Sequence, residues 1–137
     1  MPLLVGAILA ISVGLMATVV GLDRDRAFYP TVMIVIALLY VLFAVIGGST
    51  DVLLVEALVA SVFIAAAIWG FRSSLWIVVV ALAAHGCLDV FHGRVIANRG
   101  APEWWPQFCA TYDILAAAYL AWLLRRDRSQ ARFRKSA

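Results

Sequence analysis

Three ionisable side chains recur at helical spacing in AAHGCLDVFHG, residues 83–93, a segment otherwise apolar enough to cross a bilayer. They are His85, Asp89 and His92. At about 100° per residue, spacings of four and seven return to the same side of an α-helix. Ionisable groups are costly at membrane depth and usually mark function there. The segment therefore predicts one wall of a site inside a membrane-spanning bundle.

Imidazole nitrogens and carboxylate oxygens are ligands for divalent metal ions such as zinc and iron. Two more carboxylates lie in other apolar segments, and Cys109 shares a helical face with one of them, Asp113, as an additional ligand or a bystander. Carboxylates beside a metal can also accept protons, which makes Glu56 and Asp113 the candidate catalytic bases. The predicted metal ligands are His85, Asp89, His92, Asp113 and Glu56.

The sequence predicts that transmembrane helices hold these residues. Of the 137 residues, 65% are hydrophobic and 14% are charged, unlike an ordinary soluble domain. Nearly uncharged runs of about 20 residues recur, each long enough to span ~30 Å of hydrocarbon. We predict an all-α polytopic bundle in one domain, residues 1–124, with a basic cytoplasmic tail at 125–137. Its five helices are expected at about 2–22, 30–47, 52–70, 75–92 and 108–124.

The distribution of Lys and Arg predicts the orientation of this bundle. Five helices put the termini on opposite sides, and a cytoplasmic C-terminus leaves nine basic residues inside against two, Arg94 and Arg99, outside. The N-terminus is therefore predicted outside. Counted from the outer helix ends at 1.5 Å per residue, Glu56, Asp89 and Asp113 all lie ~6–7.5 Å deep. The sequence thus predicts one site in the outer leaflet, open to the outer face, with His92 near its mouth.

Residues 93–107 form the longest predicted loop, directly above this layer. One reading is a connector that anchors at the membrane surface through Trp104 and Trp105. The other is a lid over a lipophilic substrate, with Asn98 or Arg94 binding a polar head group. Both readings stay open at this point.

The net charge of +3 does not indicate nucleic-acid binding. Six of the eleven basic residues follow Leu124 as a membrane-flanking tail, and no groove-reading motif accompanies them. The expected partners are the lipid bilayer, a lipophilic substrate, and further copies of the chain or a larger membrane complex. A stripe of small residues in the first helix, among them Gly6, Ala10 and Gly14, favours close helix packing.

The stretches DRDRAFYPTV, HGCLDVFH and WWPQFCATYDILAAAYLAWLL resemble a family of small multi-pass bacterial membrane proteins with no assigned activity. The resemblance implies a bacterial inner (cytoplasmic) membrane protein. A fainter likeness links His85 and Asp89 to membrane hydrolases of the alkaline ceramidase superfamily, which hold zinc between transmembrane helices. Those hydrolases have seven helices and a third histidine, whereas this chain has two histidines in all.

The leading hypothesis is an integral membrane metalloprotein, a metal-dependent hydrolase or an oxidase acting on a lipid or lipophilic substrate. Whether the chain is an enzyme stays open. One alternative is a proton- or cation-coupled transport component, because the same residues can relay charge. A second is an accessory subunit of a membrane complex, and a third is plain polar packing between helices.

Overall fold

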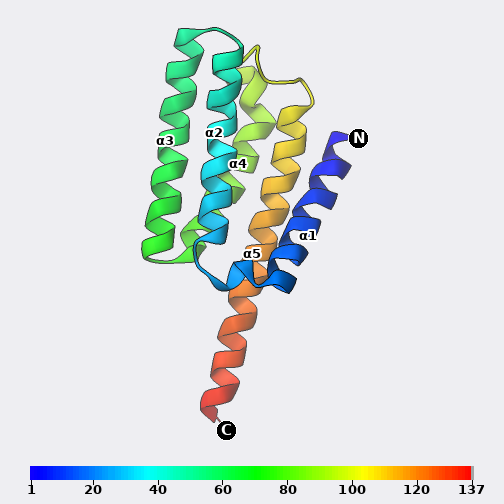
Figure 1. The fold of residues 1–137 in the computed structure, drawn as a ribbon, viewed down its shortest axis with the longest axis vertical. Coiled ribbons are helices and arrows are strands. Elements are labelled where there is room, and N and C mark those ends of the chain that lie inside the picture. Colours follow the sequence, from blue (N-terminus) through cyan, green and yellow to red (C-terminus); the bar gives the residue numbers. More distant parts are fainter. Residues whose placement is uncertain (137) are drawn as a thin grey trace.

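The computed structural model describes the backbone of residues 1–136 and the side chains of residues 1–127. The chain is an all-α bundle, and the described residues include no strand. Its five helices run alternately up and down through short connections, as predicted (Figure 1). The elements are α1 (Pro2–Val20), the 3₁₀ turn η1 (Leu22–Arg24), α2 (Phe28–Ile46), α3 (Thr50–Arg72), α4 (Leu75–Val95) and α5 (Trp105–Ser136).

Local signals in the sequence set the ends of the helices. Gly21 closes α1 in the left-handed conformation, φ 89°, which glycine adopts without steric cost. The side chains of Ser49 and Ser74 cap α3 and α4 by accepting hydrogen bonds from backbone N–H groups two or three residues ahead. These caps fix where the two helices that carry Glu56 and His85 begin.

Helix α4 lies at the centre of the bundle, in contact with α2, α3 and α5. Helix α1 packs against α5 at the edge opposite α3 (Figure 1). The small residues predicted to allow close packing in α1 are buried in this contact. A Cβ atom at Gly6 would lie 2.4 Å from the Phe108 carbonyl oxygen, so only glycine permits this approach.

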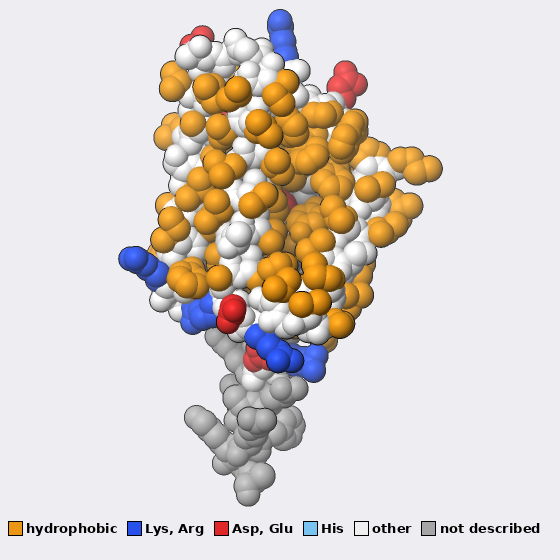
Figure 2. All heavy atoms as spheres, in the orientation of Figure 1, with side chains coloured by type: hydrophobic (Ala, Val, Ile, Leu, Met, Phe, Trp, Pro, Cys, Tyr) orange, Lys and Arg blue, Asp and Glu red, His pale blue; other side chains and the backbone are white. Residues whose placement is uncertain are grey.

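The outer surface of the bundle is apolar along its length, with charged side chains gathered at the two ends (Figure 2). All five helices are long and apolar enough to cross a membrane. Five ionisable side chains lie inside instead, and none is more than 2% exposed: Glu56, His85, Asp89, His92 and Asp113. Apolar groups outside and ionisable groups inside form the distribution expected of a membrane protein with an internal site.

Helices α2 and α3 each begin two residues before their predicted starts, and α3, α4 and α5 end after their predicted ends. Helix α4 continues past His92 to Val95, and α5 begins at Trp105 and not at 108, because Pro106 is tolerated in a first helical turn. Helix α5 also continues beyond Leu124 to Ser136. The polar residues after Leu124 end the apolar span without a glycine or proline that would end the helix. The cytoplasmic location of residues 125–137 stays a prediction, as does the orientation of the bundle.

Candidate metal centre

Four buried side chains from two helices form a compact cluster, which we call the four-residue cluster. Helix α4 supplies His85 and Asp89, and α5 supplies Cys109 and Asp113, each pair four residues apart. One potential ligand atom from each residue lies within 4.8 Å of all the others. The Nδ1 atom of His85 is 2.7 Å from Asp113 Oδ2 and 3.4 Å from Asp89 Oδ2. Nitrogen, oxygen and sulfur donors thus converge on one point.

Close packing of α4 on α5 brings the two halves of the cluster together. Gly86 follows His85 and faces α5, where a Cβ atom would lie 3.0 Å from the Ala110 carbonyl oxygen and 3.1 Å from Asp113 Cβ. Such distances are tighter than ordinary van der Waals contact. The missing side chain of Gly86 therefore lets Asp113 reach His85.

Three carboxylate oxygens in the cluster lack hydrogen bonds. Both oxygens of Asp89 and the Oδ1 atom of Asp113 are buried and accept no hydrogen bond from any described residue. The Tyr40 hydroxyl and the Cys109 thiol lie close to Asp89, but without the geometry of a hydrogen bond. Buried oxygens of this kind cost several kcal/mol each, roughly 2–7 for a neutral polar group and more for a charge. A bound cation would remove that cost.

The spacing of the cluster fits a small metal ion. Zinc bonds of about 2.0–2.3 Å in a tetrahedral site place neighbouring ligand atoms roughly 3.3–3.8 Å apart. The separations in the cluster run from 2.7 Å to at most 4.8 Å, on both sides of that range. Shifts of about 1 Å or less, within the reach of side-chain rotation, would therefore complete a four-ligand site. Thiolate, imidazole and carboxylate together suit zinc or iron better than magnesium or calcium.

Glu56 and His92 lie outside this cluster and bind each other instead. His92 Nε2 is 3.0 Å from Glu56 Oε1. The side-chain amide of Asn98 donates to the same Glu56 oxygen at 2.8 Å and to the backbone carbonyl of Tyr40 at 3.0 Å. We call these two residues the Glu56–His92 pair. The structure thus divides the five predicted ligands into a group of three, joined by Cys109, and a separate pair.

Tyr40 lies between the two groups. Its ring stacks on the His92 ring with centroids 3.9 Å apart, and its centroid is 6.0 Å from that of His85. The sequence alone predicts only a packing role for Tyr40, in the middle of its helix, and offers Asn98 as a head-group ligand in one of the two readings of the loop. A signal for Tyr40 was present, because it continues the buried face of α2 formed by Met33, Ile36 and Ala37.

The sequence predicted that the site opens to the outer face, with His92 near its mouth. The position of His92 was wrong, because His92 is buried. Residues after α4 fold back over it, and Asn98 reaches Glu56 beneath them. The loop is held by Gly100, whose backbone lies so close to the Phe43 carbonyl that no side chain fits. The loop is thus a cover over the Glu56–His92 pair, and its two predicted roles, as a surface anchor or as a lid over a substrate, stay predictions.

Comparisons with protein-family models, with curated proteins and with solved structures found no match to this chain. The resemblances noted in the sequence therefore stay predictions. What can be said of function depends on the geometry of the cluster.

Proposed function

We propose that this chain is a membrane metalloprotein that binds one divalent transition-metal ion, zinc or iron, through His85, Asp89, Cys109 and Asp113. The observation that carries the proposal is the convergence of these four donors around buried carboxylate oxygens that no described residue satisfies. A structural network of hydrogen bonds would leave few such oxygens. A metal ion supplies the missing positive charge and the missing contacts at once.

We further propose that the centre acts on a lipid or another lipophilic substrate, as a hydrolase or an oxidase. A divalent metal supplies an activated water to the first reaction, and a redox-active metal supplies dioxygen chemistry to the second. Asp113 belongs to the ligand group, so the proton-accepting role falls to Glu56. His92 and Tyr40 connect Glu56 to the four-residue cluster.

The experiment is metal analysis of the chain purified in detergent without chelator and then loaded with zinc or ferrous iron. The expected result is about one ion per chain in the unaltered protein and less than a tenth of that in Asp89→Asn and His85→Ala. Cys109→Ser is matched by Cys87→Ser, since Cys87 is exposed and outside the cluster. Cys109→Ser should weaken zinc binding and Cys87→Ser should not. A folded, unaltered chain that takes up no metal would overturn the proposal.

One observation favours a second candidate, a proton- or cation-coupled transport component. Hydrogen bonds join Asn98, Glu56 and His92, and the ring of Tyr40, which stacks on His92, extends this line to Asp89. Between Glu56 and Arg72, α3 carries no acidic or basic residue, and α4 carries none before His85. The line therefore reaches the cluster from one end of the bundle only, which suits access of protons to a reaction centre better than passage across the membrane. Flux of protons or zinc into liposomes that Asp89→Asn abolishes would support transport instead.

The proposed location is a bacterial inner membrane, with the N-terminus outside and the C-terminus cytoplasmic. Arg24, Arg26 and Arg72 lie at the same end of the bundle as the C-terminal part of α5, and the bias of basic residues toward that end supports the orientation. Fusion of a fluorescent protein to the C-terminus should give a fluorescent membrane fraction. A periplasmic alkaline phosphatase fused there should stay inactive.

A further inference from the structure

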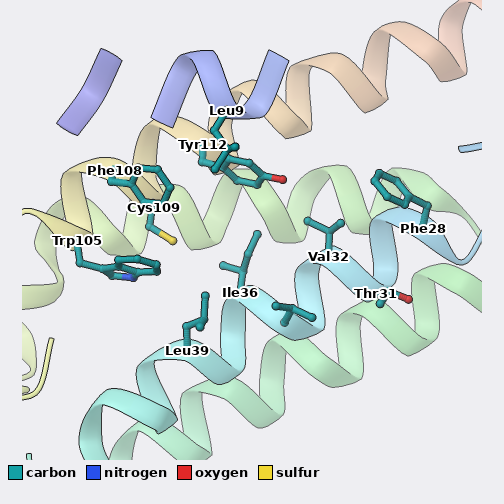
Figure 3. Close-up of a pocket in the computed structure, with 11 residues that line it drawn as sticks. Leu9, Phe28, Thr31, Val32, Ile36, Leu39, Trp105, Phe108, Cys109 and Tyr112 are labelled. Carbon is teal, nitrogen blue, oxygen red and sulfur yellow. The ribbon is translucent and has the colours of Figure 1, made fainter. Parts of the chain in front are cut away.

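An apolar groove opens on the surface of the bundle between α2 and α5, with a volume of about 350 Å³. Figure 3 shows residues of both helices around it, with Leu9 of α1 at its edge. Its lining is almost entirely hydrocarbon. The groove lies on a face whose exposed side chains are apolar, so its occupant comes from the membrane.

The groove exists because α2 and α5 do not pack closely on each other. Helix α2 contacts α3 and α4, while α5 contacts α4 and α1 (Figure 1). Helix α4, which carries His85 and Asp89, contacts both α2 and α5 and therefore forms the floor of the space between them. Cys109 is both a lining residue of the groove and a member of the four-residue cluster. The groove thus runs past the candidate metal centre.

The dimensions of the groove select one kind of occupant. Along α2 it extends from Phe28 to Leu39, which is about 16 Å at 1.5 Å per residue. That length is about half of the ~30 Å hydrocarbon thickness of a bilayer. A helix 10 Å wide and 16 Å long occupies roughly 1,200 Å³, so it could lie over this groove but not within it. A single hydrocarbon chain fits where a helix of a second protein does not.

The two ends of the groove differ in chemistry. Near Leu39 lie Trp105 and Cys109. Toward Phe28 the lining includes the hydroxyls of Thr31 and Tyr112, and that of Thr31 already donates to the Ala27 carbonyl within α2. The indole nitrogen of Trp105 is buried and donates to no described residue. A buried indole N–H normally has a partner, so this end offers a donor to an oxygen atom of a ligand.

We propose that the groove binds one hydrocarbon chain of a lipid, with the tail toward Phe28 and the oxygen-bearing end at Trp105 and Cys109. The oxygen-bearing end then lies beside the four-residue cluster. This names the substrate class of the proposed metal centre, a lipid whose reacting group adjoins a single acyl or isoprenoid-like chain. The role of this lipid as substrate rests on the proposed function. Binding of its hydrocarbon chain in the groove does not.

The test uses palmitic acid with a diazirine at the tail end, incorporated into phosphatidylcholine vesicles with the purified protein. After illumination, mass spectrometry should find cross-links concentrated on the Phe28 end of the groove. Val35→Trp places an indole across the groove and should lower this labelling at least fivefold. Leu38→Trp is the matched control, since Leu38 is 45% exposed, Val35 is 53% exposed, and only Val35 lines the groove. Equal labelling of the exposed faces of α1 and α3, or no loss in Val35→Trp, would overturn the proposal.

Metal analysis of the same samples separates this inference from the proposed function. Val35→Trp should keep its metal while losing the cross-links, and Asp89→Asn should lose metal while keeping them. Metal without groove labelling rejects the lipid site alone. Groove labelling in a chain that binds no metal rejects the metal centre and leaves the lipid site supported.

Discussion

The four-residue cluster and the Glu56–His92 pair are equally buried and each joins a histidine to a carboxylate, yet among the described residues only the cluster has buried carboxylate oxygens without a hydrogen bond. In the pair, Glu56 Oε1 receives the Asn98 amide and meets His92 Nε2. In the cluster, Asp89 has no hydrogen bond within the described part of the chain. No atom of the pair is among the buried polar atoms without a partner in the described residues, whereas three oxygens of the cluster are.

Whether a buried carboxylate has hydrogen-bond partners distinguishes a group that the fold itself satisfies from a binding site better than residue type does. A buried carboxylate with its partners in place costs the fold little, because hydrogen bonds replace those lost from water. A buried carboxylate without partners is retained only if something else binds it. We therefore expect the pair to stabilise the fold directly, and the cluster to stabilise it only when metal is bound.

The largest expected effect comes from removing one member of the pair. Glu56→Ala leaves His92 and Asn98 without a shared partner in the interior, and breaking a buried pair typically costs about 3–5 kcal/mol. Thermal unfolding in detergent should show this loss with or without chelator. Glu103→Ala removes an exposed carboxylate and serves as the control. An equally stable Glu56→Ala variant would contradict the structural role of the pair.

The next effect is stabilisation of the cluster by metal. An ion that binds only the folded chain adds about 2.7 kcal/mol at a concentration 100 times its dissociation constant. Zinc should therefore raise the unfolding temperature of the unaltered protein and of Glu56→Gln, but not of Asp113→Asn. Without metal, Asp89→Asn should be as stable as the unaltered chain or more so, because it removes a buried charge that accepts no hydrogen bond, while His85 keeps its closer contact with Asp113. Loss of the zinc effect in Glu56→Gln would show that the two groups form one site.

The sequence predicted the helices and the faces of the cluster because both depend on local spacing. Hydropathy indicates five spans, and the interval of four puts His85 with Asp89 and Cys109 with Asp113. Contacts between side chains of one helix or of its close neighbour follow from such spacing. The membership of His85, Asp89 and Asp113 in one group could therefore be predicted, and Cys109 could be suspected.

The partner of Glu56 could not be predicted, because it depends on how α3 and α4 are offset. Glu56 is six residues from the start of α3 at Thr50, whereas His92 is three from the end of α4 at Val95. They nevertheless form a contact, so the two helix ends are offset by about 4.5 Å, or most of a turn. Asn98 depends further on a loop whose path is set by the contact of Gly100 with α2. Neither the offset between α3 and α4 nor the path of this loop can be read from the hydropathy of the sequence.

A smaller effect is expected at the contact that joins the two halves of the cluster. Gly86→Ala puts a Cβ atom 3.0 Å from the Ala110 carbonyl oxygen and 3.1 Å from Asp113 Cβ. Overpacking of this kind costs about 1–3 kcal/mol and moves α5 away from His85. Zinc affinity, measured by competition with a chromophoric chelator, should fall at least tenfold. Gly93→Ala, with open space around the added methyl group, should change neither property.

The smallest expected effect is that of Asn98→Ala, which tests whether the loop completes the pair. The variant loses the hydrogen bonds that Asn98 donates to Glu56 and to the Tyr40 carbonyl, and the one that it accepts from the Gly100 N–H. Glu56 keeps its contact with His92. Each of these bonds is worth roughly 0.5–1.5 kcal/mol, and because the site is only part-buried, water replaces most of them, so the expected net loss of unfolding free energy is about 1 kcal/mol. Arg99→Ala, at the exposed next residue, should stay within about 0.5 kcal/mol of the unaltered chain. Because Asn98 makes no hydrogen bond to the four-residue cluster, zinc binding should not change. Loss of metal in Asn98→Ala would mean that the cover over Glu56 also controls the four-residue cluster through Tyr40.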